Sequence, residues 1–223
     1  MLKWEIGDCV QLMKSVEDNS VDFMFTDPPY GVNYVSGYYK EHGAIANDSF
    51  IDPVFNKKWL SEASRILKPT SAVMICTRWD VWNDWCELIS SHWDIKNMIV
   101  WAKNNWSAGD LTGNIGNQHE LIIFATRNSF KIHGKRQTNL WKFNRVSSKR
   151  HPTEKPVAMI KRGIELCTDE GDLVLDPFLG SGTMLEACYH TKRNCIGFEI
   201  ESKYEYLYKD RSGSQIMNLS DYI

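Results

Sequence analysis

The sequence predicts an α/β fold with a doubly wound, mostly parallel sheet, and three observations support this. Seven short apolar runs have the length and composition of strands. Most of these runs are apolar at consecutive positions, as strands are when helices cover both faces of a sheet. Longer segments with helical periodicity lie between several of the runs, and such alternation favours parallel pairing.

The strand and helix candidates occur along nearly the whole chain. The predicted strands cover residues 3–7, 20–26, 71–77, 95–102, 119–126, 172–178 and 194–200. The predicted helices cover residues 54–67, 81–92, 156–167, 183–191 and 202–210. Because the 223 residues show no internal repeat and no linker, we expect one domain spanning residues 1–223.

Two segments lack both periodicities and are predicted to be insertions in this domain. Residues 31–50 mix glycine with tyrosine, so we expect a mobile loop there. Residues 127–150 contain eight basic side chains and no acidic one, although the whole chain has a net charge of −2. The tail after Arg211 is expected to be frayed.

The basic segment has two interpretations. One sign of charge on an otherwise acidic chain is typical of a site for a polyanion. Phe130, Trp141 and Phe143 alternate with the basic residues, which suits stacking on a sugar or a base. A solvated surface hairpin with apolar anchors explains the same pattern equally well. Both interpretations stay open from these residues alone.

The composition is that of a globular protein in a reducing compartment. Six cysteines are scattered without a CxxC pair, so buried thiols are expected rather than disulfides. We see no set of His, Cys, Asp and Glu with metal-site spacing, and we predict no metal. The first ten residues lack the apolar run of a signal peptide, and no later run has membrane-spanning length. We therefore expect a cytoplasmic protein without a membrane partner.

The strand over residues 20–26 ends in the stretch TDPPYG. Pro28 and Pro29 cannot donate to a sheet ladder and fix φ, so they predict a rigid turn. Asp27 offers acceptor oxygens, and the Pro28 carbonyl is a further acceptor. With the flat ring of Tyr30, these groups can hold something planar that carries an amino group. The simpler alternative is a strand end whose carboxylate is satisfied by local amides.

A second constellation lies in the stretch DLVLDPFLGSGT. A buried strand leads to Asp176, a turn with Gly180 and Gly182, and a helix that opens near Thr183. The third glycine of a dinucleotide fingerprint is missing. The next strand carries Glu199 near its end, where a carboxylate can accept both ribose hydroxyls. The pattern fits a nucleoside cofactor without a pyrophosphate, or an ordinary strand-turn-helix connection.

Taken together and in this order, DPPY at 27–30, HPTEKP at 151–156 and DPFLGSGT at 176–183 resemble the β-class S-adenosylmethionine-dependent amino-methyltransferases of DNA. The resemblance runs from about Ile6 to Tyr206. It implies a seven-stranded, Rossmann-like methyltransferase sheet with a circularly permuted motif order. It also implies methyl transfer from S-adenosylmethionine to the N6 amine of adenine in double-stranded DNA.

The resemblance also implies roles for individual residues. Asp27, Pro28, Pro29 and Tyr30 match the catalytic tetrad. Glu199 matches the acid that binds the ribose hydroxyls, Asp8 the acid near the cofactor adenine, and Asp176 the acid near the methionine amino group. The remaining cofactor-binding matches are Thr153, Lys155, Phe178, Gly180, Gly182 and Thr183. The implied DNA-binding residues of the target-recognition segment 127–150 are Lys135, Arg136, Lys142, Arg145, Lys149 and Arg150.

This resemblance makes mechanistic and structural predictions. The target base is flipped out, Asp27 and the Pro28 carbonyl accept its amino hydrogens, and the methyl group is transferred directly in line. Because the motif order is permuted, the N-terminal strand must complete a pocket built by C-terminal strands. Asp8 and Glu199 should therefore face one cavity. Trp101, with the following residues 103–105, is expected to line its far side.

Several alternatives remain. N4-cytosine methylation uses the same tetrad, and an inactive DNA-binding protein is a candidate from a different class. RNA or a protein amide fits the basic segment less well. His119, Glu120 and His151 are expected to be structural, as are most of the tryptophans. A homodimer and a restriction endonuclease, in a restriction-modification system, are the other candidate partners.

Overall fold

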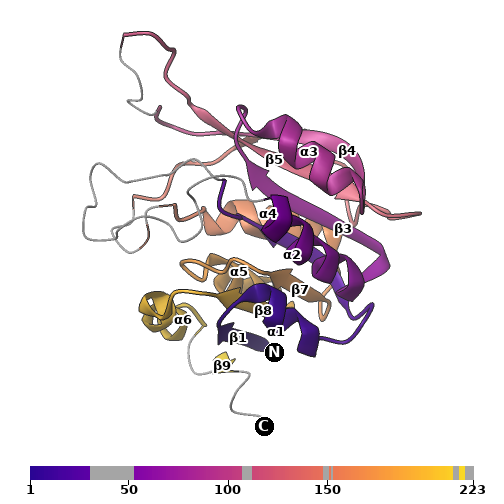
Figure 1. Cartoon of the computed structure of the whole chain (residues 1–223). Helices are drawn as coiled ribbons and strands as arrows, with labels where there is room; N and C mark the ends of the chain where they lie inside the picture. The colour runs from indigo at the N-terminus through magenta and orange to yellow at the C-terminus, as the bar shows by residue number, and fades with distance from the viewer. Residues whose placement is uncertain (31–52, 107–111, 148–150, 152, 213–215, 219–223) are drawn as a thin grey trace.

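The structure, a computed structural model, describes residues 1–30, 53–106, 112–147, 151, 153–212 and 216–218. The predicted mobile loop at 31–50 and the predicted DNA contacts Lys149 and Arg150 lie outside these residues. The described strands form one sheet with the order β6-β4-β5-β3-β2-β7-β8-β1-β9 (Figure 1).

All seven predicted strands are present. They are β1 (Leu2–Ile6), β2 (Val21–Thr26), β3 (Leu67–Thr77), β4 (Asp94–Ala102), β5 (His119–Thr126), β7 (Leu173–Asp176) and β8 (Asn194–Glu199). The prediction of a mostly parallel sheet is confirmed. Only the pairs of β5 with β3 and with β4 run antiparallel among the pairings in this described sheet.

The predicted strand number of seven is wrong, because the described sheet has nine strands. The two additional strands are β6 (Leu140–Lys142) and β9 (Ile216–Asn218). Each has three residues and pairs with a single neighbour at one edge of the sheet, β6 with β4 and β9 with β1. A run of three residues is too short to display the alternation that identifies a strand, so these two depend on tertiary pairing. The tail predicted to fray thus contributes an edge strand.

Helices cover both faces of the sheet, as expected for a doubly wound fold. α1 (Cys9–Leu12), α2 (Pro53–Ile66) and α3 (Trp82–Ser90) pack on one face, and α4 (Val157–Cys167), α5 (Thr183–Thr191) and α6 (Glu205–Ser212) on the other. The strands alternate between the two cores: Phe23 and Phe25 of β2 face α4, whereas Met24 faces α2. Two short 3₁₀ turns, at Met13–Ser15 and Ser202–Tyr204, complete the described helical elements.

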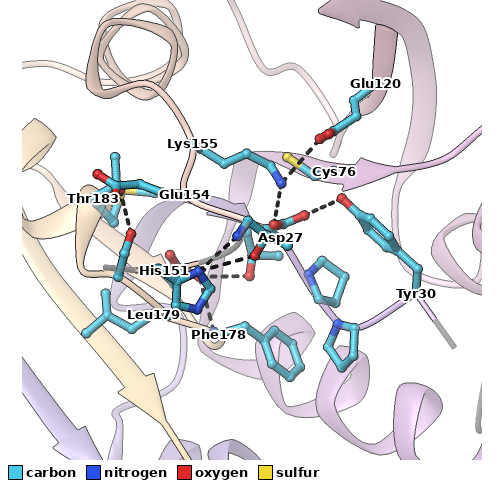
Figure 2. A pocket seen from close by; sticks show the side chains of 18 of the residues that line it. Asp27, Tyr30, Cys76, Glu120, His151, Glu154, Lys155, Phe178, Leu179 and Thr183 are labelled. Carbon is cyan, nitrogen blue, oxygen red and sulfur yellow. Dashed lines mark hydrogen bonds and ion pairs between the residues drawn. The ribbon is translucent and has the colours of Figure 1, made fainter. Parts of the chain in front are cut away.

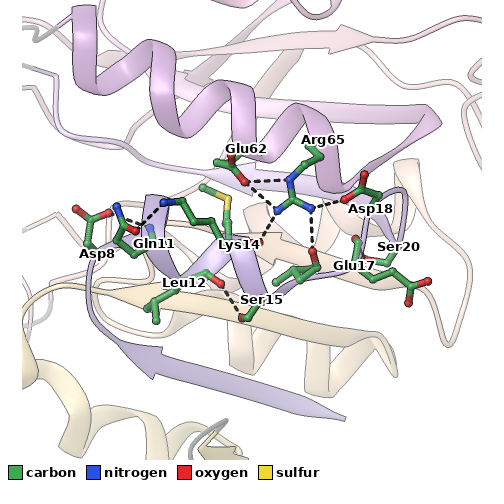
Figure 3. A network of polar contacts seen from close by, with 12 residues as sticks. Asp8, Gln11, Leu12, Lys14, Ser15, Glu17, Asp18, Ser20, Glu62 and Arg65 are labelled. Carbon is green, nitrogen blue, oxygen red and sulfur yellow. Dashed lines mark hydrogen bonds and ion pairs between the residues drawn. The ribbon is translucent and has the colours of Figure 1, made fainter.

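Arg65, in the last turn of α2, fixes the chain that leads into β2. Its guanidinium donates to the carbonyls of Met13 and Val16 and to the carboxylates of Asp18 and Glu62 (Figure 3). Both carbonyls belong to the turn that follows α1. The network therefore locks this turn against α2 and sets where β2 enters the sheet.

The permuted topology appears in the pairing of the first strand. β1 lies between β8 and β9, with Ile6 opposite Glu199. β2 lies at the centre, with β3 on one side and β7 on the other, so the direction of winding reverses between β2 and β7. Such a switch point leaves a crevice at the carboxyl ends of the strands. Asp27 and Asp176 stand at this position.

The aromatic residues of the basic segment are used for packing. Trp141 is buried, and Phe130 packs edge-on against Phe124 at a centroid distance of 6.2 Å. The guanidinium of Arg162 on α4 lies over the ring of Phe143 at 4.6 Å. For these aromatic side chains the structure favours apolar anchoring over stacking on a nucleic acid.

The first basic residue of the same segment, Arg127, is also structural. Its guanidinium donates to the carbonyls of Ser64 and His92 and lies 4.6 Å from the ring centroid of Trp93. Arg127, which is not among the implied DNA contacts, therefore supports the anchoring interpretation for the start of this segment.

The prediction of free thiols is confirmed, since all six cysteines are unpaired and five are buried. Within the described ranges, no helix combines the length and the apolar character needed to cross a membrane.

Candidate functional site

The carboxyl ends of four parallel strands open onto one cavity of about 580 Å³. β1, β2, β7 and β8 each supply an acidic side chain at or just beyond their last residues. These side chains are Asp8, Asp27, Asp176 and Glu199. The prediction that Asp8 and Glu199 face one cavity is therefore confirmed.

Asp27 follows β2 and lies on the cavity wall, with its side chain 22% exposed. The Tyr30 hydroxyl donates to its Oδ1, and the Lys155 ammonium donates to its Oδ2 at 2.5 Å (Figure 2). Pro28 and Pro29 cannot donate to the sheet, so the strand ends here and the chain turns Tyr30 back toward the acid. All four residues of this stretch line the cavity.

A second carboxylate lies on the other side of Lys155. The Lys155 Nζ is 3.2 Å from Oε2 of Glu120, and the Lys103 ammonium donates to Oε1 at 2.7 Å. Glu120 belongs to β5, and Figure 2 shows its carboxylate pointing toward the Lys155 ammonium. Two acids and two lysines thus compensate one another in a corner that is largely shielded from solvent.

The two acids in this corner differ in how firmly they are ionised. Burial raises the pKa of Asp27, and the Lys155 ammonium offsets only part of that rise. Burial acts in the same direction at Glu120, but Lys155 and Lys103 outweigh it and lower the pKa of Glu120 to about 2. Burial favours the neutral amine of Lys155, yet Asp27 and Glu120 hold its pKa above the ordinary value. Glu120 is therefore the more strongly ionised acid.

Asp176 ends β7 and is buried at the switch point. Its Oδ1 accepts from the Thr26 hydroxyl at 2.8 Å and from the Phe178 amide at 3.1 Å. Burial raises the pKa of Asp176 to about 7, although these two bonds favour the ionised form. Both donors are neutral. A cationic ligand group in the cavity would therefore stabilise this carboxylate strongly.

Two backbone amides fix the Glu199 carboxylate, one from the glycine-rich turn and one from the chain that follows β8. The Gly180 and Glu201 amides donate to its two carboxylate oxygens, each at 2.8 Å. Gly180 and Gly182 have φ of 50° and 76°, a region that favours glycine. A Cβ on Gly182 would lie 2.7 Å from the Tyr208 ring. Each oxygen of Glu199 keeps a lone pair for a hydroxyl donor from a ligand.

Residues 153–156 are anchored to the helices of the second face. Arg211 of α6 donates to Glu154 at 2.5 Å and to Glu186 of α5 at 2.6 Å, and its side chain is only 3% exposed. Thr153, next to this ion pair, lines the cavity. The position of the segment thus depends on a buried charge network.

The remaining predicted cofactor residues take different places. Phe178 and Thr183 line the cavity, and the Phe178 ring packs edge-on against Trp59 at 5.2 Å. Asp8 also caps α1, because its Oδ1 accepts from the Val10 amide at 2.7 Å. Gly182 does not line the cavity. It stands at the N-cap of α5 and leaves room for Tyr208.

The described members of the predicted DNA-binding set are all exposed: Lys135, Arg136, Lys142 and Arg145. Only Arg145 of these four lines the cavity, where its backbone amide donates to Asn104 at 2.9 Å. As expected, Trp101, Lys103 and Asn105 also contribute to the cavity wall, whereas Asn104 does not. Trp79 and Trp106 line it as well but are 55% and 68% exposed, whereas most tryptophans were expected in the core.

Sequence reasoning missed the part that Glu120 takes in the site. We expected a structural role for it, because a single acid beside a histidine in a β-rich run has no motif. The structure places it against a lysine that follows it by 35 positions in the chain. The only signal in the sequence was its position at the start of a central apolar strand, where a charge is costly unless paired.

Comparison with known proteins is consistent across sequence and structure. A model of the N6/N4 DNA methylase family matches residues 21–210. The type II methyltransferase M2.MboI of Moraxella bovis is 30% identical over 239 residues, which cover 92% of this chain and 85% of the relative. The type II methyltransferase M.HpaI of Haemophilus parainfluenzae is 28% identical over 243 residues, covering 94% and 73%.

Solved structures share the fold. The M1.HpyAVI–SAM complex superposes with a TM-score of 0.72 at 23% identity and covers 95% of this chain and 100% of the other. At this identity the likeness concerns the arrangement of the sheet and its helices.

Proposed function

Since this chain belongs to the N6/N4 DNA methylase family, we propose that it transfers a methyl group from S-adenosylmethionine to the N6 amine of adenine in double-stranded DNA. The observation that carries the proposal is a cavity with two chemically different, adjoining parts. The Asp27–Tyr30 turn forms one part, and Asp176, Glu199 and the glycine-rich turn form the other.

The part of the cavity with Asp176 and Glu199 fits a nucleoside cofactor that carries a positive charge. Glu199 is held by two backbone amides so that its remaining lone pairs can accept ribose hydroxyls. Asp176, buried among neutral donors, suits the ammonium of an amino acid moiety. Asp8, which also lines the cavity, can accept from an adenine amine. S-Adenosylmethionine, when bound, supplies a methyl group activated by a sulfonium.

The part of the cavity with Asp27 and Tyr30 fits a planar base with an exocyclic amine. That amine is a weak nucleophile because its lone pair is delocalised into the ring. Asp27 and the Pro28 carbonyl can each accept one amino hydrogen, which turns the lone pair out of the ring plane. The rigid proline pair holds both acceptors in place before the substrate arrives, so little reorganisation is needed. Alignment in a shielded site supplies the rest of the rate gain.

The target amine is inaccessible inside a duplex, so the base has to leave the stack at a cost of about a few kcal/mol. Tyr30 borders the cavity beside Asp27 and offers a ring on which the extruded base can stack, typically worth about 1–3 kcal/mol. Lys135, Arg136, Lys142 and Arg145 are exposed and can contact phosphates.

The experiment uses purified protein, unmethylated double-stranded DNA and methyl-labelled S-adenosylmethionine. The DNA is digested to nucleosides, and the labelled nucleoside is identified by mass spectrometry. We expect label in N6-methyladenine. Label in N4-methylcytosine would keep the mechanism and replace the target base, because the same acceptor pair serves either amine. No label, with cofactor binding verified by thermal stabilisation, would overturn the proposal in favour of an inactive DNA-binding protein.

The type II designation of both relatives supports a place beside a restriction endonuclease, which acts on the same DNA site. The prediction of a homodimer is tested by light scattering of the purified protein with and without DNA.

A further inference from the structure

We propose that Glu120 is a positioning residue for methyl transfer: it retains the Lys155 ammonium when the target amine and its cationic product occupy the Asp27 carboxylate. The inference rests on the proposed function. It assigns a part in the reaction to a residue outside the sequence motifs.

Asp27 already has two hydrogen-bond partners in the structure. Its Oδ1 accepts from Tyr30 and its Oδ2 from Lys155 at 2.5 Å. A carboxylate that is already paired with an ammonium is a poorer acceptor for a neutral amine, because the cation draws on the same negative charge. For Asp27 to accept fully from the target base, its hydrogen bond with the Lys155 ammonium must weaken.

Methyl transfer changes the charge next to Asp27. When the amine nitrogen forms its bond to the methyl group and the sulfonium loses that bond, positive charge develops on the nitrogen beside Asp27. Two cations would then share a single carboxylate unless Lys155 has another partner. Repulsion between like charges is strong in a site of low dielectric and would oppose methyl transfer.

Glu120 can be this second partner, because it is already in contact with Lys155. Its Oε2 is 3.2 Å from the Lys155 Nζ, and Lys155 is only 9% exposed, so water is a poor alternative. Glu120 is fixed by its backbone, opposite Trp101 in the β4–β5 ladder, and by Lys103 at 2.7 Å. The flexible lysine is the member of this group that can move, and a small rotation shifts it from one acid to the other.

Among the residues that the structure describes, the remaining ionisable groups around Lys155 do not compete for this part. Besides Asp27 and Glu120, Cys76 at the end of β3 faces the ammonium, and burial keeps the pKa of this thiol well above its ordinary value. The pKa of Glu120, about 2, keeps this acid charged through the working range. Glu120 is the firmer counter-ion of the two carboxylates.

A purely structural role for Glu120 predicts something different. In that case the acid only neutralises two buried lysines, and its removal would lower stability and cofactor binding together with activity. The positioning role predicts a loss confined to the methyl-transfer step.

The test compares Glu120→Gln with Glu165→Gln, a matched control at an exposed position of α4. Single-turnover methyl transfer is measured at saturating DNA and S-adenosylmethionine. We expect E120Q to lose about 10- to 100-fold in this rate, as when a hydrogen bond to a charged group is removed, with unchanged thermal stabilisation by the cofactor. The acid limb of the rate–pH profile should also move to lower pH, because the charge of Glu120 raises the pKa of Asp27.

Two further variants keep the test decisive. Glu120→Asp retains the charge and should recover part of the rate. In a Lys155→Met background, which no longer has an ammonium to hold, adding E120Q should cause little further loss of rate. Additive losses, a wild-type rate in E120Q, or an E120D protein as slow as E120Q would each overturn the inference. If wild-type protein with verified cofactor binding labels no base, the proposed function itself has failed.

Discussion

At the scale of single residues, the site is defined by four acids whose surroundings give them different tasks. Asp27 is held by Tyr30 and Lys155, and Glu199 by two amides. Asp176 is held by a hydroxyl and an amide, and Asp8 by the amides at the start of α1. Carboxylates bound to different partners differ in charge and in spare acceptor capacity. Substitutions at each should therefore produce separable defects.

Replacing Asp27 by alanine should abolish methyl transfer while leaving cofactor affinity unchanged. The variant loses the acceptor that turns the amine lone pair, and removal of one such preorganised group typically costs about 10²–10³ in rate. Single-turnover labelling measures the rate, and calorimetry measures cofactor affinity. A D27A protein that still methylates DNA at the wild-type rate would exclude the proposed role.

Cofactor binding should weaken as the pH falls below 7. The pKa of Asp176 is raised to about 7 without a ligand, and the neighbouring Asp27 and Glu199 contribute to the rise. A cationic amino group binds the ionised acid better, so affinity is full above pH 7 and declines as the acid takes up a proton. Titrations between pH 8 and 6 should show this trend in the wild type. A dissociation constant that does not change over this range would contradict it.

The same acid should oppose folding. Because the folded-state pKa of Asp176 lies above the usual value of 3.8, the ligand-free protein loses stability as the pH rises from about 4 to 7. Asp176→Asn should therefore raise the ligand-free melting temperature at pH 8, by about 2–4 °C per kcal/mol regained, and reduce the shift that the cofactor produces. A lower melting temperature in the variant would argue against this account.

At the scale of elements, the sequence predicted the strands and helices that have many residues and regular patterns. Most of the predicted strands bury side chains on both faces, which leaves a clear apolar run. β1 and β4 bury side chains mainly on one face, and their apolar residues still gave a recognisable pattern. β6 and β9 were missed because three residues carry no pattern of their own. α1 was missed too, since four residues capped by Asp8 show no helical period.

The candidate site was predictable to a similar extent. Asp27 and Asp176 stand at strand ends beside prolines and glycines, which are local signals. Glu120 and Arg211 act through partners far away in the chain, and only the folded structure reveals that pairing. The Arg127 interactions were missed for the same reason, because a basic residue in a basic run gives no sign that it packs inward.

The turn before α5 allows a matched test of close packing. Gly182 and Gly134 both have positive φ, but a Cβ on Gly182 would meet the Tyr208 ring at 2.7 Å, whereas nothing lies within 4 Å of one on Gly134. Gly→Ala at either position costs backbone strain of about 1 kcal/mol. G182A should lose an additional 1–3 kcal/mol, roughly the cost of overpacking. Denaturant unfolding measures both, and equal losses would exclude a packing role.

At the scale of the whole molecule, an acidic body carries an exposed basic segment beside the cavity. Neutralising Lys135, Arg136, Lys142 and Arg145 to glutamine should weaken DNA binding and flatten its salt dependence. The slope of log K against log salt should decrease by about 0.9 for every phosphate that is no longer neutralised. Fluorescence anisotropy at several salt concentrations measures this slope. The same reduction of affinity at every salt concentration would show that these side chains do not bind phosphates.

Cofactor-induced stabilisation is the control for this experiment, and it is measured on a triple variant of Lys135, Arg136 and Lys142. It should equal that of the wild type, because none of these three residues lines the cavity.

The position of β1 between β8 and β9 has a consequence for biosynthesis. A ribosome releases β1 first, yet its partner β8 emerges only after nearly the whole chain has been made. The central pair β2 and β3 can form early, while β1 must wait for β8 before this pairing can form. Such long-range pairing slows folding. The cavity lined by Asp8 and Glu199 is therefore incomplete until β8 has been synthesised and pairs with β1.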